Sequence, residues 1–253
     1  MPAIIFGVIT IYYLTDWPHQ ARWLPDDERN WLTAELEREK LAMNTVRSKG
    51  VFEAFWQVVV LTVGYFFMVS AVYGFNFWLP TIIKRQSGFS NVHVSLISAV
   101  PFCVGLVAML LIGSSSDKTQ ERRWHTALPM IIASVGLLFG VIAQNHLAIA
   151  VGMFSVAAVG CYGYIPPFWS LPTSFLTGTA AAATIGLINS TGNLGGFVGP
   201  YVVGYISKST GTLFGGVLYL SLSALVAAFL ILSVRATRQK SVSDKLQFVV
   251  AED

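Results

Sequence analysis

The sequence predicts an all-α membrane protein that crosses the bilayer several times. Hydrophobic residues make up 54% of the 253-residue chain and charged residues only 11%, whereas soluble domains carry roughly 25% charged residues. Six apolar stretches are each about as long as the ~20 residues that a helix needs to cross the hydrocarbon core. Acidic and basic residues lie between these stretches or at their edges.

The first apolar stretch, within residues 1–14, is shorter than the six. It runs directly into Asp16, Trp17 and Pro18, an aromatic and polar exit of the kind found at a membrane interface. We interpret it as a partial transmembrane helix, and we expect that the sequence starts inside this helix. It does not resemble a secretory signal peptide, because it lacks a basic start and a small-residue cleavage site.

Residues 15–53 form the longest polar segment and are expected to be cytoplasmic. Pro25 is followed by three acidic residues, which predicts a helix start. The good helix formers that follow predict a short amphipathic helix, in which Glu35 and Arg38 are spaced for an i,i+3 ion pair. Acids and bases are balanced along the segment, so it does not favour nucleic-acid binding.

Residues 54–234 are expected to form a transmembrane domain of six helices, and residues 235–253 a cytoplasmic tail. The predicted spans cover residues 54–83, 92–113, 126–143, 147–171, 180–206 and 213–234. A charge in the middle of a span costs about 2.5–3.5 kcal/mol, and none of the six carries one. The short connections between the spans predict sequential antiparallel helices. Six spans also suit the three-plus-three inverted repeats of many secondary transporters.

The basic residues predict the orientation of these spans. Alternating connections would place thirteen bases on one side, namely Arg22, Arg29, Arg38, Lys40, Arg47, Lys49, Lys118, Arg122, Arg123, Arg235, Arg238, Lys240 and Lys245. The other side receives only Lys84, Arg85 and Lys208. The positive-inside rule therefore places the first set, with the C-terminus, in the cytoplasm.

The fifth predicted span is rich in glycine and asparagine. At 100° per residue, five of these residues fall within one stripe of about 120°: Gly186, Asn189, Gly192, Asn193 and Gly196. The pairs Gly192/Gly196 and Gly195/Gly199 have the small-xxx-small spacing that lets two helices approach closely. Two interpretations remain open. The stripe could serve tight helix packing, with the amides as interhelical hydrogen bonds, or Asn189 and Asn193 could face a cavity that binds a solute.

Polar and aromatic residues in two other spans allow the same two interpretations. Tyr73 and Asn76 share one face of the first span, and Tyr162 and Trp169 share a face of the fourth. A Pro166–Pro167 pair predicts a break in that fourth helix, and irregular backbone at membrane depth is tolerated only against protein or a cavity. These side chains either pack against neighbouring helices or line a solute path.

The polar connection at residues 114–125 contains Asp117 followed by Arg122 and Arg123. An acid and paired arginines between two spans can bond helix ends and hold neighbouring helices in one conformation. Simple anchoring by positive charge would not call for Asp117. We therefore predict that Asp117, Arg122 and Arg123 form a conformational, or gating, loop.

Several of these motifs resemble the major facilitator superfamily. The pattern Gly113-x-x-x-Asp117-Lys118-x-x-x-Arg122-Arg123 is similar to its loop between spans eight and nine. Segment 13–29 resembles the central loop after span six in its anion:cation symporter family, and segments 73–82 and 188–200 resemble spans seven and eleven. The resemblance covers essentially the whole chain and is closest to bacterial carriers of tartrate-like, phthalate-like or sugar-acid anions.

This resemblance implies a C-terminal six-helix bundle of a twelve-span transporter, preceded by the end of span six. It implies a proton-coupled symporter of small organic anions, with most coupling carboxylates in a missing N-terminal six-helix half. Consistent with that, all 13 acids of the chain lie in loops or at span edges. By resemblance, Asn189, Asn193 and Trp169 are the first substrate-binding residues expected in this half, followed by Tyr73, Asn76 and Tyr162.

Other functions are also compatible with the sequence. The chain could be a half-transporter that pairs with itself, or a non-transporting interaction or sensor protein of the membrane. An enzyme is not expected, because no nucleophile–base set or phosphate-binding loop is present. No cofactor, metal or disulfide is predicted, since Cys103 and Cys161 each lie within an apolar run. The expected location is the bacterial inner membrane.

Overall fold

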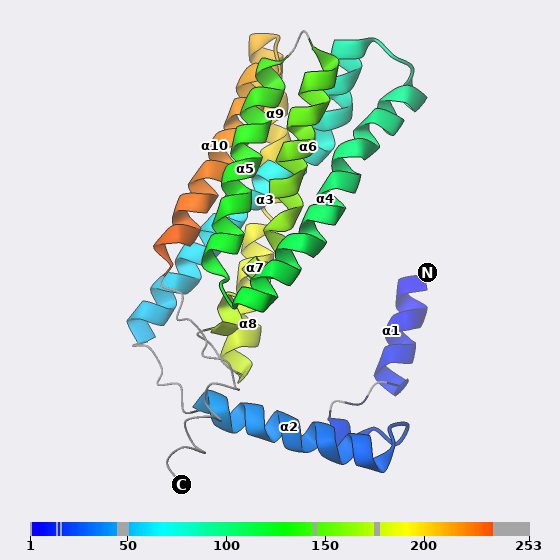
Figure 1. Cartoon of the computed structure of the whole chain (residues 1–253), viewed down its shortest axis with the longest axis vertical. Helices are drawn as coiled ribbons and strands as arrows, with labels where there is room; N and C mark the ends of the chain where they lie inside the picture. Colours follow the sequence, from blue (N-terminus) through cyan, green and yellow to red (C-terminus); the bar gives the residue numbers. More distant parts are fainter. Residues whose placement is uncertain are drawn as a thin grey trace. The chain divides into compact units, whose positions relative to one another are not determined.

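The computed structural model describes residues 2–13, 15, 17–44, 51–143, 146–174 and 178–234. The chain divides into two compact units, residues 1–48 and 49–253, and each is considered by itself below. Figure 1 shows that the described secondary structure is helical throughout, as the sequence predicts. The predicted tail, residues 235–253, lies outside the described residues.

The first unit contains two helices and a short 3₁₀ turn. Helix α1 (Pro2–Tyr13) has 12 residues, a length of about 18 Å, which is less than the ~30 Å hydrocarbon core. Helix α2 (Asp26–Asn44) begins directly after Pro25, with three acids in its first turn. Its predicted i,i+3 ion pair is confirmed, because Arg38 lies 3.7 Å from the Glu35 carboxylate. The turn between the two helices is η1 (Pro18–Gln20).

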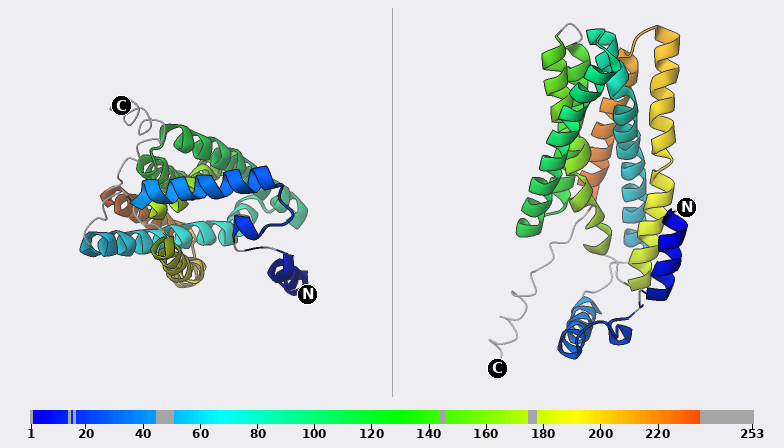
Figure 2. Two further views of the ribbon diagram at one scale, coloured as in Figure 1. Left: turned by 90° about the horizontal axis from the view of Figure 1, so that it is seen from below. Right: turned by 90° about the vertical axis from the view of Figure 1, so that its right-hand side faces the viewer.

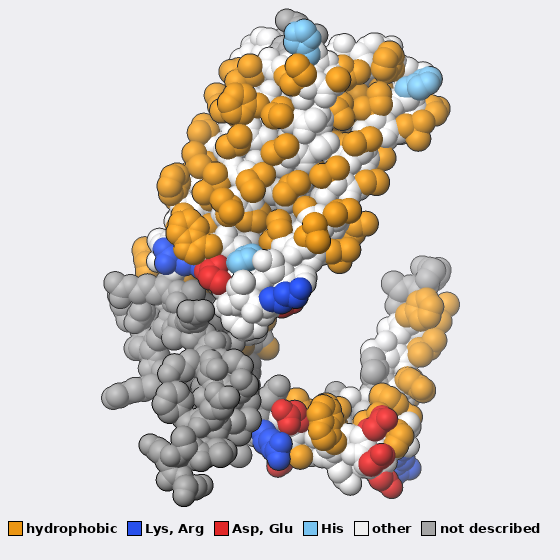
Figure 3. All heavy atoms as spheres, in the orientation of Figure 1, with side chains coloured by type: hydrophobic (Ala, Val, Ile, Leu, Met, Phe, Trp, Pro, Cys, Tyr) orange, Lys and Arg blue, Asp and Glu red, His pale blue; other side chains and the backbone are white. Residues whose placement is uncertain are grey.

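The second unit is a bundle of long helices (Figures 1 and 2). In chain order they are α3 (Val51–Ser87), α4 (Asn91–Thr119), α5 (Arg123–Ile142), α6 (Leu147–Gly163), α7 (Ile165–Trp169), α8 (Gly178–Gly192), α9 (Gly195–Thr210) and α10 (Phe214–Ser233), with the 3₁₀ turn η2 (Pro172–Ser174) between α7 and α8. Apolar side chains cover the length of the bundle, while the visible charged and histidine side chains lie at its ends (Figure 3). This distribution suits a bundle surrounded by lipid.

Five helical segments among the described residues are long and apolar enough to cross a membrane. They are Phe55–Ser87, Asn91–Thr119, Arg123–Ile142, Leu147–Trp169 and Phe214–Ser233. Each corresponds to a span predicted from the sequence, although α3 and α4 are longer than predicted. The remaining predicted span, residues 180–206, is divided into α8 and α9, which have only 15 and 16 residues.

The prediction of one continuous helix over residues 180–206 is therefore wrong. The chain leaves α-helical geometry at Asn193 and Leu194, although α8 and α9 follow one another along one column of the bundle (Figure 2, right). Around the break the backbone bonds span three residues, from the Leu194 N–H to the Thr191 carbonyl and from the Gly196 N–H to the Asn193 carbonyl. Such bonds belong to a tighter 3₁₀ turn, which is often found where a helix is interrupted.

Two further boundaries follow from local chemistry. The break predicted at Pro166–Pro167 is present, because α6 ends at Gly163 and the two prolines occupy the first turn of α7, where a missing N–H costs little. The predicted loop at residues 114–125 is mostly helical instead. Helix α4 continues to Thr119, and only residues 120–122 separate it from α5.

Glycines allow the closest contacts inside the bundle. A Cβ atom on Gly160 of α6 would lie 2.1 Å from the Pro129 carbonyl oxygen of α5, and one on Gly136 of α5 would lie 2.4 Å from the Ala157 nitrogen of α6. These backbone contacts leave no room for a side chain. Helices α5 and α6 therefore pack at backbone-to-backbone distance.

Candidate functional site

The described part of the bundle has an open depression of about 630 Å³ between α3 and α9. Its lining residues are Tyr73, Asn76, Phe77, Gly196, Phe197, Pro200 and Tyr201. Tyr73 and Asn76 lie one turn apart on α3, and Gly196 lies against the Tyr73 ring, so that a Cβ atom there would be 3.3 Å from it. The structure thus brings Tyr73 and Asn76, which the sequence analysis placed on one face of the first span, together with Gly196 of the fifth.

The position of α9 beside α3 depends on two other glycines. A Cβ atom on Gly195 would lie 2.2 Å from the Phe66 carbonyl oxygen, and one on Gly199 would lie 2.1 Å from the Ser70 carbonyl oxygen. Since these neighbours are backbone atoms, they cannot move aside as a flexible side chain would. Gly195 and Gly199 therefore set the separation of the two helices, and with it the width of the depression.

Asn76 also has a partner from a third helix. The Tyr162 hydroxyl on α6 donates a hydrogen bond of 2.9 Å to the Asn76 side-chain oxygen. Tyr162 itself does not line the depression. Two residues predicted as separate solute contacts are thus joined, with Asn76 lining the depression and Tyr162 behind it.

Trp169 belongs to an aromatic cluster at the junction of α3, α7 and α8. Its ring meets the Tyr65 ring edge-on, with the centroids 5.1 Å apart, and Phe168 stacks on Tyr65 at 5.0 Å. A Cβ atom on Gly192 would lie 2.2 Å from the Tyr65 ring. Tyr65 therefore connects Trp169 to Gly192 and to the α8–α9 break.

Asn189 and Asn193 lie at this break and are exposed on the described bundle. The Asn193 side-chain nitrogen donates a hydrogen bond of 2.6 Å to the Asn189 side-chain oxygen. The bond joins the last turn of α8 to the first residue of the break. Neither asparagine lines the depression between α3 and α9. The predicted stripe is only partly a packing face, because Gly192 is buried whereas Gly186 has no atom within 4 Å of a built Cβ.

The chemistry of this region is polar but uncharged. Asn76 carries an amide, Tyr73 and Tyr201 carry phenols, and Gly196 allows close approach to the α9 backbone. Such groups can donate hydrogen bonds to carboxylate or hydroxyl oxygens and offer aromatic faces to apolar parts of a solute. Among the described residues, no group of three or more His, Cys, Asp or Glu side chains could hold a metal ion.

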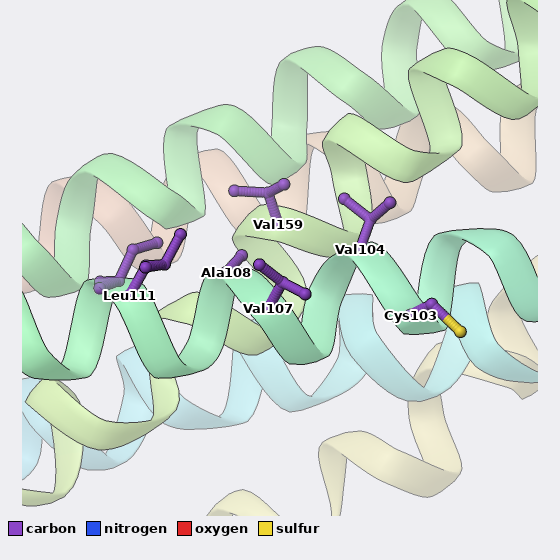
Figure 4. A pocket seen from close by; sticks show the side chains of 7 residues that line it. Cys103, Val104, Val107, Ala108, Leu111 and Val159 are labelled. Atoms are coloured by element: carbon purple, nitrogen blue, oxygen red, sulfur yellow. The ribbon is translucent and has the colours of Figure 1, made fainter.

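A second depression, of about 540 Å³, lies between α4 and α6 and is almost entirely apolar (Figure 4). It is lined by Cys103, Val104, Val107, Ala108, Leu111, Ile112 and Val159. Its lining offers no N–H or O–H side-chain donor for an anion. We therefore place the candidate solute site in the α3–α9 region and not here.

At the other polar feature, the α4–α5 connection, the structure joins two of the three predicted loop residues. The Arg122 guanidinium lies 2.5 Å from the Asp117 carboxylate and also donates to the Ser116 hydroxyl at 3.1 Å. Arg123 is the first residue of α5, and its buried Nε has no hydrogen-bond partner among the described residues. The pair of Asp117 and Arg122 thus spans the turn between two transmembrane helices.

The sequence analysis missed Glu121 at this connection. Its carboxylate accepts hydrogen bonds from the backbone N–H groups of Trp124, at 2.9 and 3.0 Å, and of His125, at 3.2 Å. An acid immediately before a helix start is a recognisable signal for such capping. With this cap, α5 begins at Arg123, three residues before the start of the predicted span at residue 126.

The apolar, membrane-length helices of the described bundle define a multi-pass membrane protein. A family model described as Major Facilitator Superfamily matches residues 1–200. The chain therefore belongs to the major facilitator superfamily, and the recognition made from its motifs is confirmed.

Several curated relatives are similar over nearly the whole chain. A protein of Agrobacterium vitis named "Putative tartrate transporter" is 39% identical over 246 residues, which are 96% of this chain and 54% of the relative. The "Quinolone resistance transporter" of Acinetobacter baumannii is 31% identical, over 98% of this chain and 58% of the relative. The "Inner membrane transport protein RhmT" of Escherichia coli strain K12 is 33% identical, over 96% of this chain and 56% of the relative. The chain spans about half the length of the curated relatives it matches.

Proposed function

We propose that this chain is the C-terminal half of a secondary active transporter for small organic anions of the tartrate-like, phthalate-like or sugar-acid type. In this proposal residues 1–14 belong to span six and residues 15–53 to the cytoplasmic central loop. Residues 54–234 form spans seven to twelve, and residues 235–253 form a cytoplasmic tail. The complete protein works by alternating access in the bacterial inner membrane, coupled to protons.

The observation that carries the proposal is the depression between α3 and α9. It is open on this chain, and an alternating-access transporter binds its solute between two such halves. Its neutral donors suit an anion whose charge is balanced elsewhere, because burying a charged group next to uncharged walls alone is unfavourable. The cationic partner of the solute and the proton-coupling carboxylates are accordingly assigned to the N-terminal half.

The identity of the solute is inferred from the relatives. Proteins named for tartrate in Agrobacterium vitis share 39% and 40% of their aligned residues with this chain. The D-galactonate transporter of Escherichia coli O6:H1 is 24% identical over 68% of the chain. These names support the class of small hydroxylated acids, while the phthalate-like class rests on the resemblance of the sequence motifs.

The experiment uses this chain co-expressed with the N-terminal half of the Agrobacterium vitis relative and purified as a complex, called the assembled transporter below. Binding of tartrate, phthalate and galactonate is measured by isothermal titration, with the neutral diamide of tartrate as the matched control solute. The two halves of the relative itself, prepared in the same way, show that the split format retains binding.

We expect saturable binding of at least one acid and no binding of the neutral diamide. Equal binding of the acid and the diamide would contradict the assignment to anions. Absence of binding in the complex, with binding retained by the split relative, would contradict the proposed function. Binding by this chain without its partner would favour a half-transporter that pairs with itself.

A further inference from the structure

The side-chain amide of Asn76 has an oxygen that accepts hydrogen bonds and a nitrogen that donates them. Among the described residues, only the oxygen has a hydrogen-bond partner. Its oxygen accepts the hydrogen bond from the Tyr162 hydroxyl. Its nitrogen, which carries two N–H donors, makes no hydrogen bond to any residue that the structure describes. Because Asn76 lines the depression between α3 and α9, those donors are available to a molecule bound there.

The Tyr162 ring is held in place from α4. A Cβ atom on Gly105 would lie 2.5 Å from the ring, so the ring occupies the space that the glycine leaves free. Phe102, one turn earlier on α4, meets the same ring at a centroid distance of 6.2 Å and an interplanar angle of 70°. Packing against Gly105 and Phe102 therefore fixes where the hydroxyl lies, and the hydroxyl in turn fixes Asn76.

The orientation of the amide matters for an anion. With its oxygen turned to Tyr162, Asn76 offers N–H donors to a carboxylate oxygen. If the amide rotated by 180°, its own oxygen would face the carboxylate and repel it. A phenol donates readily to an amide oxygen and accepts less readily from an amide N–H, so Tyr162 favours the first orientation.

We propose, building on the proposed function, that Tyr162 is a positioning residue for the solute. It does not touch the solute but holds Asn76 so that its N–H groups point to a carboxylate oxygen. This assignment replaces the prediction of Tyr162 as a direct contact. It also assigns Gly105 and Phe102 a supporting role, because they fix the Tyr162 ring.

The bundle offers a matched control for this interaction. The Tyr219 hydroxyl on α10 forms a hydrogen bond of 2.9 Å with the Ser70 hydroxyl on α3. Both pairs therefore join a phenol of another helix to a polar side chain of α3. Only the Asn76 pair reaches the depression, since neither Ser70 nor Tyr219 lines it.

The test is a double-mutant cycle in the assembled transporter, read as the Kd for the anion that binds best. We expect Tyr162→Phe to raise Kd by about threefold to tenfold, the value of one hydrogen bond. In the Asn76→Ala background the same substitution should leave Kd unchanged, because no amide remains to be positioned. Tyr219→Phe should leave Kd unchanged, while lowering the thermal midpoint about as much as Tyr162→Phe does.

A further variant separates the effect of the Tyr162–Asn76 hydrogen bond from that of the Asn76 N–H groups. Asn76→Asp keeps an acceptor for Tyr162 but removes both N–H groups, so we expect a folded protein whose Kd rises by tenfold or more. The inference is overturned if Tyr162→Phe raises Kd equally with and without Asn76, if Tyr219→Phe raises it as much, or if Asn76→Asp binds normally. A wild-type complex that binds no anion overturns both this inference and the proposed function, whereas an additive cycle in a binding-competent complex overturns this inference alone.

Discussion

The Arg122 guanidinium forms an ion pair with the Asp117 carboxylate, at 2.5 Å, across the turn that joins α4 to α5. Asp117 is 71% exposed and Arg122 only 18%, so the pair lies at the surface with its basic partner covered. Exposed pairs contribute little to stability, about 0–1 kcal/mol. If the Asp117–Arg122 pair holds one conformation of the transporter, its loss should therefore change transport rates more clearly than the free energy of unfolding.

We predict that Asp117→Asn lowers the free energy of unfolding by less than about 1 kcal/mol. If the pair stabilises one of two conformations by a similar amount, its loss shifts their ratio by about fivefold, and the transport rate should fall accordingly. Initial uptake rates and thermal midpoints of the assembled transporter measure the two effects. Arg38→Gln, which removes the exposed Glu35 pair of α2, is the control and should change neither quantity.

The topology prediction concerns the two ends of the bundle. With Cys103 and Cys161 replaced by alanine, a cysteine at Gln120 should react with an impermeant maleimide only after the cells are permeabilised. A cysteine at Asn91, which is also exposed, should react in intact cells. The reason is the excess of basic residues on the side of Gln120. Strong labelling at residue 120 from outside intact cells would reverse the proposed orientation.

The glycines of α9 give a prediction about stability. Gly199→Ala should lower the free energy of unfolding by about 1–3 kcal/mol, since the added methyl group meets the Ser70 carbonyl oxygen. Gly186→Ala on α8 is the matched control, because nothing lies within 4 Å of its Cβ. It should be neutral or stabilise by up to about 1 kcal/mol, the difference in helix propensity. Unfolding in detergent micelles measures both, and equal destabilisation would refute the packing role of Gly199.

The amides at the helix break give a prediction about binding. Asn193 is exposed at the α8–α9 break but does not line the depression, so the prediction concerns a solute site that extends from the depression to the break. With such a site, Asn193→Ala should raise the Kd of the assembled transporter for its anion by about fivefold to a hundredfold, equivalent to about 1–3 kcal/mol, and leave the fold intact. Ser190→Ala is the control, because Ser190 is exposed and, among the described residues, its hydroxyl bonds only to carbonyls of its own helix. Gly196→Leu should instead reduce the amount of folded protein, since the Tyr73 ring lies against it. If Asn193→Ala lowers the thermal midpoint as much as Gly196→Leu and leaves Kd unchanged, the amides serve packing only.

The main features of the fold could be predicted from the sequence because span length and hydrophobicity determine them. The five membrane-length segments, including the α6–α7 break at Pro166 within one of them, follow from local composition. The α8–α9 break does not, since the apolar run continues through Asn193 and Leu194 without a proline. Contacts with another helix accompany that break, in particular those of Gly195 and Gly199 with the α3 backbone.

The candidate site was predictable to a similar degree. Tyr73 and Asn76 could be grouped from their spacing on one helix, and they do line one depression. The bond between Tyr162 and Asn76 joins residues 86 positions apart, so no local pattern could reveal it. The length of α4 was underestimated because its last turns are polar, although Glu121, an acid just before the start of α5, was a signal for the turn.

The measurement that tests the central claim most directly is anion accumulation in sealed vesicles. No acidic residue lies in the middle of any span of this chain, so in the proposed proton-coupled transporter the proton needs carboxylates from the N-terminal half. We predict that vesicles with the assembled transporter concentrate the labelled anion when a proton gradient is imposed, and that an uncoupler abolishes this. In vesicles that contain this chain alone, the chain should insert into the membrane, but the labelled anion should not accumulate. Uncoupler-sensitive accumulation by the chain alone, or none by the assembled transporter where the split relative is active, would contradict the account.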